Sequence, residues 1–587
     1  MQMHRSAQQS LILSALGIKN NHVRLTKPHD VKKMGTSGLR LTQDDYNRPL
    51  FFEQFIEGIA RYFESVPSEE RARGNNTILI GGDPRQGNTE RVLKAAEILV
   101  AHGFKVQVAK EGLASTPAMS HAIRHAKALG GVILTASHNP WTDVGVKVNM
   151  ASGAPALENT VNAVHQLQNE VRDFCRVDYA QAVSAGMVTE FDAIQLYANL
   201  LDSIFDFQDM QRLLVEYISR HGRTPRLAFD AMAGAAGPFA REIFGKRLGL
   251  HPTILREQPD EYLGGNNAQG HPLHPEPDFD FIPELIKLNA TLKYDLVSAW
   301  DADVDRRLNG GTGFWLESAD EFALFAKYGD LIGIKNLFTH KVEDAGTIYF
   351  CRSTVTAHAI DLMEPWLSAH YAKDGYKVRI VETPTGFKWI ADLGNWGVEE
   401  SNGVGNPYLR EKDGIFASTF LLKIMLRTGQ TAKQLMEEIW KETGRVYFTR
   451  GEVSGNDPQG QVRLTEILNS AAQRIGQKFA GLTLEAAESW DYTHPVTGQV
   501  VDRNAAWVLK FSDGVTVKAR FSGTGSGGYL LRVYGSKFDR RYDLIKSEIT
   551  QPMKAAFNAF LAANGFESRA DKFTDANQPD PYKPTAF

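Results

Sequence analysis

A short apolar run, then a loop containing glycine or proline, then a helical pattern recurs along the chain up to about residue 445. The runs are short enough to be buried strands, and they occur within residues 76–85, 130–140, 226–237, 295–301 and 377–386. Buried strands that alternate with helices predict α/β units. In such units the loops that follow the strands carry the ligand chemistry, so the functional residues are expected in those loops.

The chain after about residue 445 has a different pattern. Residues 506–521 are predicted to form two strands that turn at Asp513 and Gly514. This hairpin indicates a smaller α+β domain at the C-terminal end. A length of 587 residues corresponds to about three to five domains.

The composition excludes several function classes. The net charge of −4 provides no general attraction to nucleic acid or to an anionic membrane, so neither is expected as a partner. The chain has two cysteines, Cys175 and Cys351, which favours the cytoplasm over a disulfide-stapled secreted protein. The apolar run at residues 11–18 is predicted to be an amphipathic helix and not a signal peptide, and no run is long enough to span a bilayer.

Residues 135–140, Thr-Ala-Ser-His-Asn-Pro, follow a predicted strand and place Ser137 in a loop at the strand end. A serine hydroxyl is a weak nucleophile unless a base or a metal activates it. His138 is adjacent in sequence, but adjacent side chains need not meet. From this segment alone, a turn capped by Ser, Asn and Pro is an equally good interpretation.

Three aspartates, Asp301, Asp303 and Asp305, follow another predicted strand at i, i+2 and i+4. Carboxylates crowded in this way repel one another and are best accommodated around a cation. Ligands that are all oxygen favour Mg²⁺, Mn²⁺ or Ca²⁺ over Zn²⁺. An EF-hand would need Gly and Glu where Arg306 and Thr312 stand, so a metal loop of another kind is preferred, with a solvated acidic turn as the alternative.

The glycines of residues 520–528 fit the pattern G-x-G-x-x-G, but residues 529–534 are predicted to be a strand where a dinucleotide site needs a helix. NAD binding is therefore rejected. Small hydroxyl residues between Arg520 and Arg532 suit a loop that grips phosphate. A glycine-rich hairpin would explain the glycines but not the two arginines.

Two further loops carry polar residues suited to a sugar phosphate. Residues 398–401, Val-Glu-Glu-Ser, offer carboxylates and a hydroxyl to sugar hydroxyls. Residues 409–414 offer Arg410 and Lys412 to phosphate. Taken singly, each of these charged residues is better explained as a solvated loop residue.

These segments, in this order, resemble the α-D-phosphohexomutase superfamily, and its phosphoglucomutase branch most closely. The strings that carry the resemblance span nearly the whole chain from about residue 31, and they are Gly-Thr-Ser-Gly-Leu-Arg at 35–40, Gly-Gly-Asp-Pro-Arg at 81–85, Ser-Thr-Pro at 115–117, Thr-Ala-Ser-His-Asn-Pro at 135–140, Asp-Ala-Met-Ala-Gly at 230–234, Asp-Ala-Asp-Val-Asp-Arg at 301–306, Glu-Thr-Pro-Thr-Gly at 382–386, Glu-Glu-Ser at 399–401, Arg-Glu-Lys-Asp-Gly at 410–414 and Arg-Phe-Ser-Gly-Thr-Gly-Ser at 520–526. Ala302 and Pro84 stand where the family usually or often has glycine, and residues 141–146 are shorter than the expected loop.

The resemblance implies a fold of three α/β domains plus a smaller α+β C-terminal domain around a central cleft. The expected domains are 1–208 with the phosphoserine loop, 209–318 with the metal loop, 319–444 with the sugar-binding loop and 445–587 with the phosphate-binding loop.

The resemblance also implies site residues. Ser137 would carry the phosphoryl group, and one Mg²⁺ per subunit would bind an oxygen of phospho-Ser137 together with Asp301, Asp303 and Asp305. The catalytic residues expected around the transferred group are Arg40, His138, Lys147, Arg306 and Lys412. Of these, His138 and Lys412 are the alternatives for the general acid/base. The substrate would be held by Thr36, Ser37, Thr385, Gly386, Glu399, Ser401, Arg410, Arg520, Ser522, Thr524 and Arg532.

The implied activity is an isomerase reaction, the interconversion of α-D-glucose 1-phosphate and glucose 6-phosphate through a phosphoserine enzyme. Glucose 1,6-bisphosphate would be both the intermediate and the activator that primes the enzyme. The partners are expected to be small sugar phosphates, and the oligomeric state is left open. The alternatives are a phosphomannomutase, a phosphopentomutase, a glucose 1,6-bisphosphate synthase or a non-catalytic protein that responds to phosphosugars.

Overall fold

The computed structural model describes residues 13–35, 38–73, 75–333, 346–394, 396–522, 528–567 and 570. The chain divides into two compact units. The first unit contains Met1–Pro277, Ser298–Arg307 and Gly405–Thr419, and the second contains Asp278–Val297, Leu308–Val404 and Phe420–Phe587. Of the helix expected at 11–18, residues 13–15 are helical and residues 11 and 12 lie outside the described residues.

The first unit alternates strands and helices. Its strands are β1 (Asn20–Arg24), β2 (Leu39–Thr42), β3 (Thr77–Gly82), β4 (Lys105–Leu113), β5 (Gly130–Leu134), β6 (Asp143–Met150), β7 (Asp173–Val177), β8 (Val188–Phe191), β9 (Leu227–Asp230) and β10 (Thr253–Leu255). Its helices are α2 (Gln43–Tyr46), α3 (Phe51–Ser65), α4 (Ser68–Arg73), α5 (Asn88–Ala101), α6 (Thr116–His125), α7 (Glu158–Glu170), α8 (Tyr179–Ser184), α9 (Ala193–Phe205), α10 (Phe207–His221), α11 (Ala236–Ala240) and the π-helix η1 (Arg241–Arg247).

The main sheet of the first unit has the order β2-β6-β5-β3-β4-β8. Strand β3 runs parallel to both β4 and β5, and every residue of β3 is buried. Ile78 and Ile80 join the core formed with α3, α5 and α7, while Gly81, between them and the strand end, faces Met119 of α6. Helices therefore cover both faces of the sheet, which is why β3 and β5 are continuous apolar runs and do not alternate.

Strand β11 (Leu296–Trp300) leads into the aspartate loop. Strand β9 lies between β10 and β11, and Trp300 packs on Phe229 of β9 with ring centroids 4.9 Å apart. The Trp300 indole N–H donates to Ser418 Oγ at 3.1 Å. Ser418 belongs to α16 (Gly414–Thr428), so the segment before this helix is anchored beside the aspartate loop.

The second unit contains two sheets, with the orders β15-β14-β16-β17 and β18-β23-β22-β21-β20-β19, and a short pair of β12 and β13. Its strands are β12 (Arg307–Gly311), β13 (Phe314–Trp315), β14 (Thr347–Ser353), β15 (Lys377–Thr383), β16 (Gly397–Glu399), β17 (Gly403–Val404), β18 (Arg445–Gly455), β19 (Lys478–Phe479), β20 (Leu482–Thr493), β21 (Val500–Phe511), β22 (Val515–Phe521) and β23 (Tyr529–Asp539). Its helices are η2 (Phe279–Phe281), α12 (Pro283–Ala290), α13 (Ser318–Lys327), η3 (Gly329–Ile332), η6 (Asp361–Met363), α14 (Glu364–Ala372), α15 (Phe387–Leu393), α17 (Ala432–Thr443), α18 (Pro458–Asn469), η7 (Ala471–Arg474) and α19 (Lys546–Ala563).

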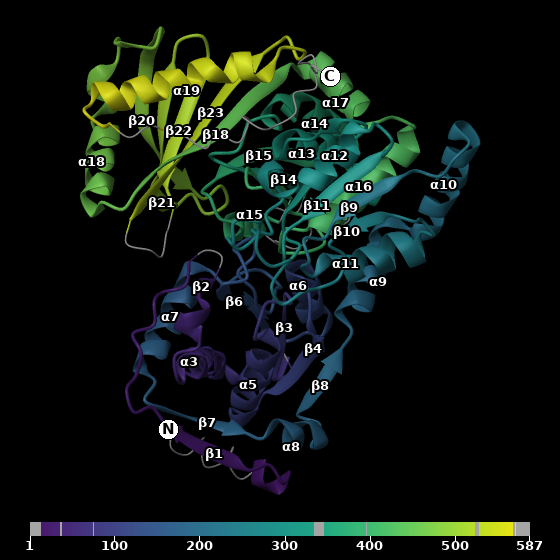
Figure 1. The fold of residues 1–587 in the computed structure, drawn as a ribbon, viewed down its shortest axis with the longest axis vertical. Coiled ribbons are helices and arrows are strands. Elements are labelled where there is room, and N and C mark those ends of the chain that lie inside the picture. The colour runs from purple at the N-terminus through teal and green to yellow at the C-terminus, as the bar shows by residue number, and fades with distance from the viewer. Residues whose placement is uncertain are drawn as a thin grey trace. The chain divides into compact units, whose positions relative to one another are not determined.

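The six-stranded sheet is antiparallel, and α19 lies along one of its faces (Figure 1). The hairpin expected at Asp513 and Gly514 is confirmed, because Phe511 of β21 pairs with Val515 of β22. Asp513 and Gly514 have φ values of 62° and 70°, in the left-handed region that Asp and Gly tolerate better than most residues. The strand expected at 529–534 is also confirmed as the first half of β23.

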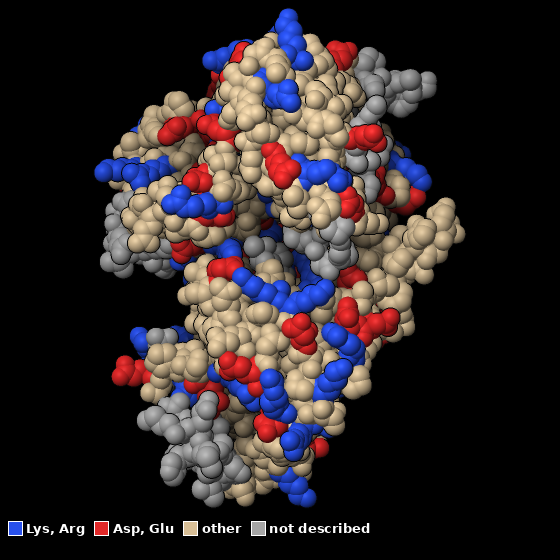
Figure 2. Space-filling model, turned by 90° about the vertical axis from the view of Figure 1, so that its left-hand side faces the viewer, with Lys and Arg blue, Asp and Glu red and all other residues tan. Residues whose placement is uncertain are grey.

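No helix within the described ranges is both long enough and apolar enough to cross a membrane. On the face shown in Figure 2, Lys and Arg side chains are interspersed with Asp and Glu. Cys175 and Cys351 are both free thiols.

The packing at the end of β3 yields a stability prediction for Gly82→Ala. A Cβ at Gly82 would lie 2.0 Å from the backbone oxygen of Leu134, which pairs with it across the sheet. Backbone cannot move aside as a side chain can, so the variant is expected to lose at least about 1–3 kcal/mol of stability. Thermal unfolding measures this loss. Gly245→Ala is the control, since its Cβ would meet nothing closer than 3.4 Å, and an equally large loss there would contradict the explanation.

Candidate functional site

Ser137 lies in the loop that follows β5, as the sequence predicted, and only 1% of it is exposed. Its φ of 54° is in the left-handed region, which costs a non-glycine residue about 1–3 kcal/mol. The Ser137 backbone N–H donates to Thr135 Oγ1 at 2.8 Å, and Thr135 Oγ1 donates to Asp83 Oδ2 at 2.6 Å. These bonds stabilise the unfavourable backbone conformation and aim the Ser137 hydroxyl, which donates to Asp301 Oδ2 at 2.9 Å.

The three aspartates predicted to bind a metal form one buried cluster. Asp301, Asp303 and Asp305 each offer a carboxylate oxygen, these oxygens lie within 4.8 Å of one another, and the residues are at most 2% exposed. Asp303 Oδ1 and Asp305 Oδ1 are buried and accept no hydrogen bond from the described part of the chain. Buried carboxylate oxygens without donors are costly unless a cation satisfies them, so the cluster fits a divalent cation.

Two lysines partly neutralise the cluster. Lys147 Nζ lies 2.7 Å from Asp303 Oδ2 and 3.1 Å from Asp305 Oδ2, and Lys412 Nζ lies 3.3 Å from Asp305 Oδ2. Burial acts to raise the pKa of Asp305, but Lys147, Lys412 and Arg306 outweigh it and hold this pKa well below its usual range. Burial and the charges of the other two aspartates raise the pKa of Asp301 well above its usual range.

His138 and two arginines lie beside the serine loop. Arg306 Nη1 donates to His138 Nδ1 at 2.7 Å. Because a guanidinium can only donate, His138 Nδ1 is the acceptor in this contact. Arg40 Nη1 donates to Asn139 Oδ1 at 3.3 Å, and burial together with Arg306 lowers the pKa of Arg40 to about 10.

The aspartate loop is held from two directions. Thr116, the first residue of α6, donates its backbone N–H to the Asp303 carbonyl at 2.9 Å and its hydroxyl to Asp303 Oδ2 at 2.6 Å. Gly414 N–H donates to the Val304 carbonyl at 2.9 Å, which brings the segment containing Lys412 to the loop. Arg410, the half-buried residue two positions before Lys412, lies in the same segment.

The second unit contains the residues predicted to hold the sugar. Glu399 ends β16 and is 5% exposed, and its Oε1 accepts the Gly386 backbone N–H at 2.8 Å. Thr385, beside Gly386 in the loop after β15, has a buried hydroxyl without a hydrogen-bond partner among the described residues. Ser401 is half-buried in the turn after β16. The structure thus brings Glu399 and the 385–386 loop together.

The predicted phosphate-binding arginines face each other across two strands. Arg520 of β22 pairs with Arg532 of β23, and Glu452 of β18 pairs with Arg532 from the other side. Like charges directly opposite in a sheet destabilise it. Both arginines have a buried Nε without a hydrogen-bond partner in the described ranges. An anion such as phosphate would offset the repulsion between the two arginines and would accept hydrogen bonds from their buried Nε groups. Ser522 follows Arg520 at the end of β22 and donates its N–H to the Leu530 carbonyl at 2.8 Å.

Glu400, whose carboxylate the sequence offered to sugar hydroxyls together with that of Glu399, links these two groups of the second unit. Its carboxylate accepts hydrogen bonds from Ser353 Oγ at 3.0 Å and Tyr534 OH at 3.3 Å. Burial acts to raise the pKa of Glu400, but Arg520 and the hydrogen bonds outweigh it, so this pKa lies below its usual range. Glu400 therefore connects the loop that carries Glu399 and Ser401 to the arginine pair.

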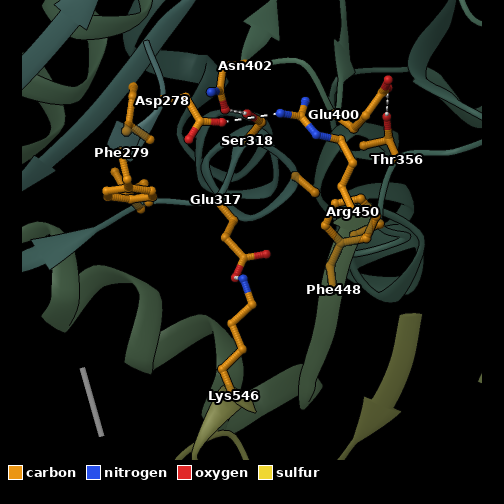
Figure 3. Close-up of a pocket in the computed structure, with 14 residues that line it drawn as sticks. Asp278, Phe279, Glu317, Ser318, Thr356, Glu400, Asn402, Phe448, Arg450 and Lys546 are labelled. Carbon is orange, nitrogen blue, oxygen red and sulfur yellow. Dashed lines mark hydrogen bonds and ion pairs between the residues drawn. The ribbon is translucent and has the colours of Figure 1, made fainter. Parts of the chain in front are cut away.

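A pocket in the second unit lies against this glutamate (Figure 3). Glu400 and Asn402 line it, and Asn402 Oδ1 accepts from Ser318 Oγ at 2.9 Å. An ion pair between Glu317 and Lys546, 2.9 Å apart, closes its lower side in this view. The pocket borders the loop that carries Glu399 and Ser401.

Some residues that were predicted to bind substrate lie outside the described ranges, and some residues that support the site were not predicted. Thr36, Ser37 and Thr524 were predicted to bind substrate and lie outside the described residues. Thr116 and Arg85 support the site, and sequence reasoning assigned neither of them a role. Both lie within strings that carry the family resemblance, and that position was the signal that could have identified them.

Comparison with protein families agrees with this geometry. Residues 31–173 match the family model described as phosphoglucomutase/phosphomannomutase, alpha/beta/alpha domain I, and residues 359–443 match domain III of the same family. Residues 445–580 match the phosphoglucomutase-1 C-terminal domain.

Individual relatives match over most of their length. Phosphoglucomutase 1 of Drosophila melanogaster is 30% identical, with 94% of this chain and 98% of the relative covered. Human phosphoglucomutase-1 is 29% identical, with 88% and 92% covered. The open form of the Paramecium exocytosis-sensitive phosphoprotein pp63/parafusin, a phosphoglucomutase, matches with a TM-score of 0.77 at 28% identity, with 94% of this chain and 98% of that chain covered.

The chain therefore belongs to the phosphoglucomutase family of the α-D-phosphohexomutase superfamily. The expected four-domain phosphohexomutase architecture, three α/β domains and a smaller α+β domain, is confirmed.

The aspartate cluster yields a prediction that separates two of its members. Without divalent cations, Asp301→Asn is expected to melt at or above the wild-type temperature, because it removes a charge that the other two aspartates repel. Asp305→Asn is expected to lose about 3–5 kcal/mol, because it leaves Lys147 and Lys412 buried with fewer counter-charges. Thermal unfolding in chelator measures both. Equal destabilisation by the two variants would contradict the assigned electrostatics.

Proposed function

We propose that the chain catalyses the interconversion of α-D-glucose 1-phosphate and glucose 6-phosphate through phospho-Ser137 and a glucose 1,6-bisphosphate intermediate. The observation that carries the proposal is the hydrogen bond from Ser137 Oγ to Asp301 within a buried cluster of three carboxylates. A nucleophile aimed at a cation site is the arrangement that phosphoryl transfer requires. Membership of the phosphoglucomutase family supports the choice of sugar phosphate.

The reaction consists of two transfers in opposite directions. In the first, the bond from phosphorus to Ser137 Oγ breaks and a bond from phosphorus to O6 of glucose 1-phosphate forms; the O6 proton goes to a general base, and the leaving Ser137 Oγ takes up a proton. The bisphosphate then reverses its orientation in the site. In the second, the bond from phosphorus to O1 breaks and a bond from phosphorus to Ser137 Oγ forms; the Ser137 hydroxyl gives up its proton, and O1 receives a proton as glucose 6-phosphate leaves.

The charges around Ser137 suit this chemistry. We propose that Asp301, Asp303, Asp305 and an oxygen of phospho-Ser137 hold one Mg²⁺ per subunit, since an all-oxygen donor set favours a hard cation. When bound, Mg²⁺ would supply charge neutralisation for the transferred phosphoryl group. Lys147, Arg306 and Arg40 would stabilise the equatorial oxygens of that group, because charge builds up there in the transition state.

The assignment of the general acid/base lies between His138 and Lys412. His138 Nδ1 is occupied by Arg306, so Nε2 is the nitrogen with which His138 would exchange a proton. Lys412 Nζ lies 3.3 Å from the Asp305 carboxylate, a position that suits proton donation to a leaving oxygen better than proton removal. We propose that Lys412 acts as the acid and that His138 is the alternative.

The parts of the substrate that do not react would be held mainly by residues of the second unit. We propose that Glu399 and Ser401 grip the sugar hydroxyls, with Thr385 and Gly386 of the same unit as further contacts. Thr36, Ser37 and Arg410, which belong to the first unit, are the other proposed substrate contacts. Arg520, Ser522, Thr524 and Arg532 would hold the second phosphate. A grip on the middle of the ring suits a bisphosphate that must bind in two orientations.

Several further assignments accompany this function. We propose glucose 1,6-bisphosphate as the activator that phosphorylates Ser137, and a cytoplasmic location on the basis of two free thiols. We retain 1–208, 209–318, 319–444 and 445–587 as the proposed domain boundaries.

A coupled assay of glucose 1-phosphate conversion with Mg²⁺ and glucose 1,6-bisphosphate tests the function. Glucose 1-phosphate is expected to have the highest kcat/KM, with mannose 1-phosphate slower, because the two sugars share the C3 and C4 hydroxyls that the sugar-binding loop would grip. A preference for mannose 1-phosphate or ribose 1-phosphate would instead identify a phosphomannomutase or phosphopentomutase. Absence of turnover with every sugar phosphate would favour the non-catalytic alternative.

The nucleophile assignment predicts that Ser137→Ala folds normally and loses essentially all turnover. The reason is that the Ser137 hydroxyl is the one aimed at Asp301 Oδ2, whereas the Thr116 hydroxyl is bonded to Asp303 Oδ2. Mass spectrometry of wild-type enzyme treated with glucose 1,6-bisphosphate should find the phosphoryl group on Ser137. Ser120→Ala, another buried serine of the first unit, which donates to the Gly153 carbonyl, is the control and should keep its turnover. Full activity of Ser137→Ala would refute the mechanism.

The arginine pair predicts a change in KM and not in kcat. Arg532→Ala is expected to raise KM for glucose 1-phosphate by roughly ten- to a hundredfold, the equivalent of a charge-assisted contact of about 1.5–3 kcal/mol. Because the phosphate that it holds does not react, its grip is the same in the ground and transition states. Lys537→Ala on the same strand is the control. A large fall in kcat at unchanged KM would show that Arg532 acts on the transferred group.

A further inference from the structure

Arg85, in the loop after β3, is surrounded by the serine loop. Its side chain is buried and only 1% of the residue is exposed. Its Nη2 donates to the Ser137 carbonyl, and its Nη1 donates to the Pro140 carbonyl at 2.6 Å and the Asp143 carbonyl at 3.3 Å. One guanidinium therefore holds the beginning, the middle and the end of the seven positions from Ser137 to Asp143.

The Nε donor of Arg85 fixes the guanidinium itself. Arg85 Nε donates to Asp83 Oδ2 at 2.9 Å, and Asp83 is also buried. The same Asp83 oxygen accepts from Thr135 Oγ1, which in turn accepts the Ser137 N–H. Arg85 thus contacts the Ser137 carbonyl directly, and Asp83 reaches the Ser137 N–H through Thr135.

The hydrogen bonds within the serine loop connect residues that are close in sequence. Asn139 N–H donates to the Ala136 carbonyl at 3.2 Å, and Asp143 N–H donates to the Pro140 carbonyl at 3.0 Å. Such turns set the local shape of the loop but do not fix its position on the sheet. Because Ser137 has an unfavourable φ and its hydroxyl must reach Asp301, a tether from outside the loop is needed.

We propose that Arg85 is a positioning residue for phosphoryl transfer, which holds Ser137 Oγ in line with the aspartate cluster by binding three carbonyls of the serine loop. The inference rests on the proposed function and adds to it the residue on which the alignment of the nucleophile depends. Arg85 does not touch the substrate in this role. Its ion pair with Asp83 balances its charge, so its contribution is the geometry of the planar fork.

The planar, forked guanidinium of Arg85 explains why lysine cannot replace this arginine. A guanidinium presents five donors in fixed directions, and Arg85 uses Nε, Nη1 and Nη2 toward different acceptors. An ammonium in the same place keeps the charge but offers three donors from one point. It cannot reach carbonyls at both ends of the loop together.

The test compares Arg85→Lys with Arg91→Lys. Arg91 is another buried arginine of the first unit, and its guanidinium contacts Gln43, Asn47 and the Gln86 carbonyl rather than the carbonyls that Arg85 holds. Arg85→Lys is expected to lower kcat by about tenfold to a hundredfold, the cost of a misplacement of about 1 Å, with KM changed less than about threefold. Hydrogen exchange of residues 136–146 should become faster in this variant alone.

A second variant covers the case in which Arg85→Lys does not fold. Adding guanidinium chloride at millimolar concentration to Arg85→Ala is expected to restore kcat in a saturable way. The guanidinium ion can occupy the position that the Arg85 side chain leaves empty. Sodium chloride at the same ionic strength should not restore activity. Rescue of kcat without a matching change in melting temperature separates positioning from a purely structural role.

The outcomes distinguish this inference from the proposed function. Wild-type protein that turns over no sugar phosphate would refute the function, and the hydrogen-exchange comparison would still test the tether. Wild-type kcat in Arg85→Lys, with unchanged exchange at 136–146, would overturn the inference while leaving the function intact. Equal losses of kcat and melting temperature in Arg85→Lys and Arg91→Lys would overturn it as well.

Discussion

The repulsion among three buried carboxylates is the constraint on which the first unit depends. Two unit charges 4.8 Å apart repel by about 3–4 kcal/mol at an effective dielectric constant of about 20, and Asp301, Asp303 and Asp305 form three such pairs. Cationic side chains and a hydrogen-bond donor from distant parts of the chain offset this repulsion. Lys147 comes from β6, Lys412 from the segment before α16, and the Thr116 hydroxyl from the start of α6. The buried oxygens that remain without donors are the reason to expect a divalent cation as well.

The serine loop shows how a rigid scaffold supports a reactive group. A left-handed backbone at Ser137 is unfavourable in isolation, and the structure maintains it through bonds to the N–H and the carbonyl of that residue. The residues that form these bonds, Thr135 and Arg85, lie at the ends of neighbouring parallel strands. Loops at the carboxyl ends of such strands meet at one edge of the sheet, which is why the β3 and β5 loops can stabilise each other.

The second unit has a comparable arrangement for anions. Arg520 and Arg532 lie opposite each other on adjacent strands, where like charges are unfavourable, and Glu400 and Glu452 balance them only in part. A sheet that keeps two arginines side by side gains from a bound phosphate. The bond from Tyr534 to Glu400 connects this pair to the loop of Glu399, so the residues proposed to hold phosphate and sugar belong to one hydrogen-bonded group within the unit.

The sequence alone determined the local features of this protein. Short apolar runs predicted β3, β5, β9, β11 and β15, the Asp-Gly pair predicted the hairpin, and the spacing of the aspartates predicted a cation site, because each feature depends on neighbours within a few residues. Only the tertiary structure decided that Ser137 donates to Asp301, 164 residues away, and that Lys412 joins the same cluster. The role of Arg85 in holding the serine loop could not be predicted from the sequence either, because its acceptors are backbone carbonyls, which every residue possesses. Such contacts depend on which strand ends the packing of the sheet brings together, and no local pattern encodes that.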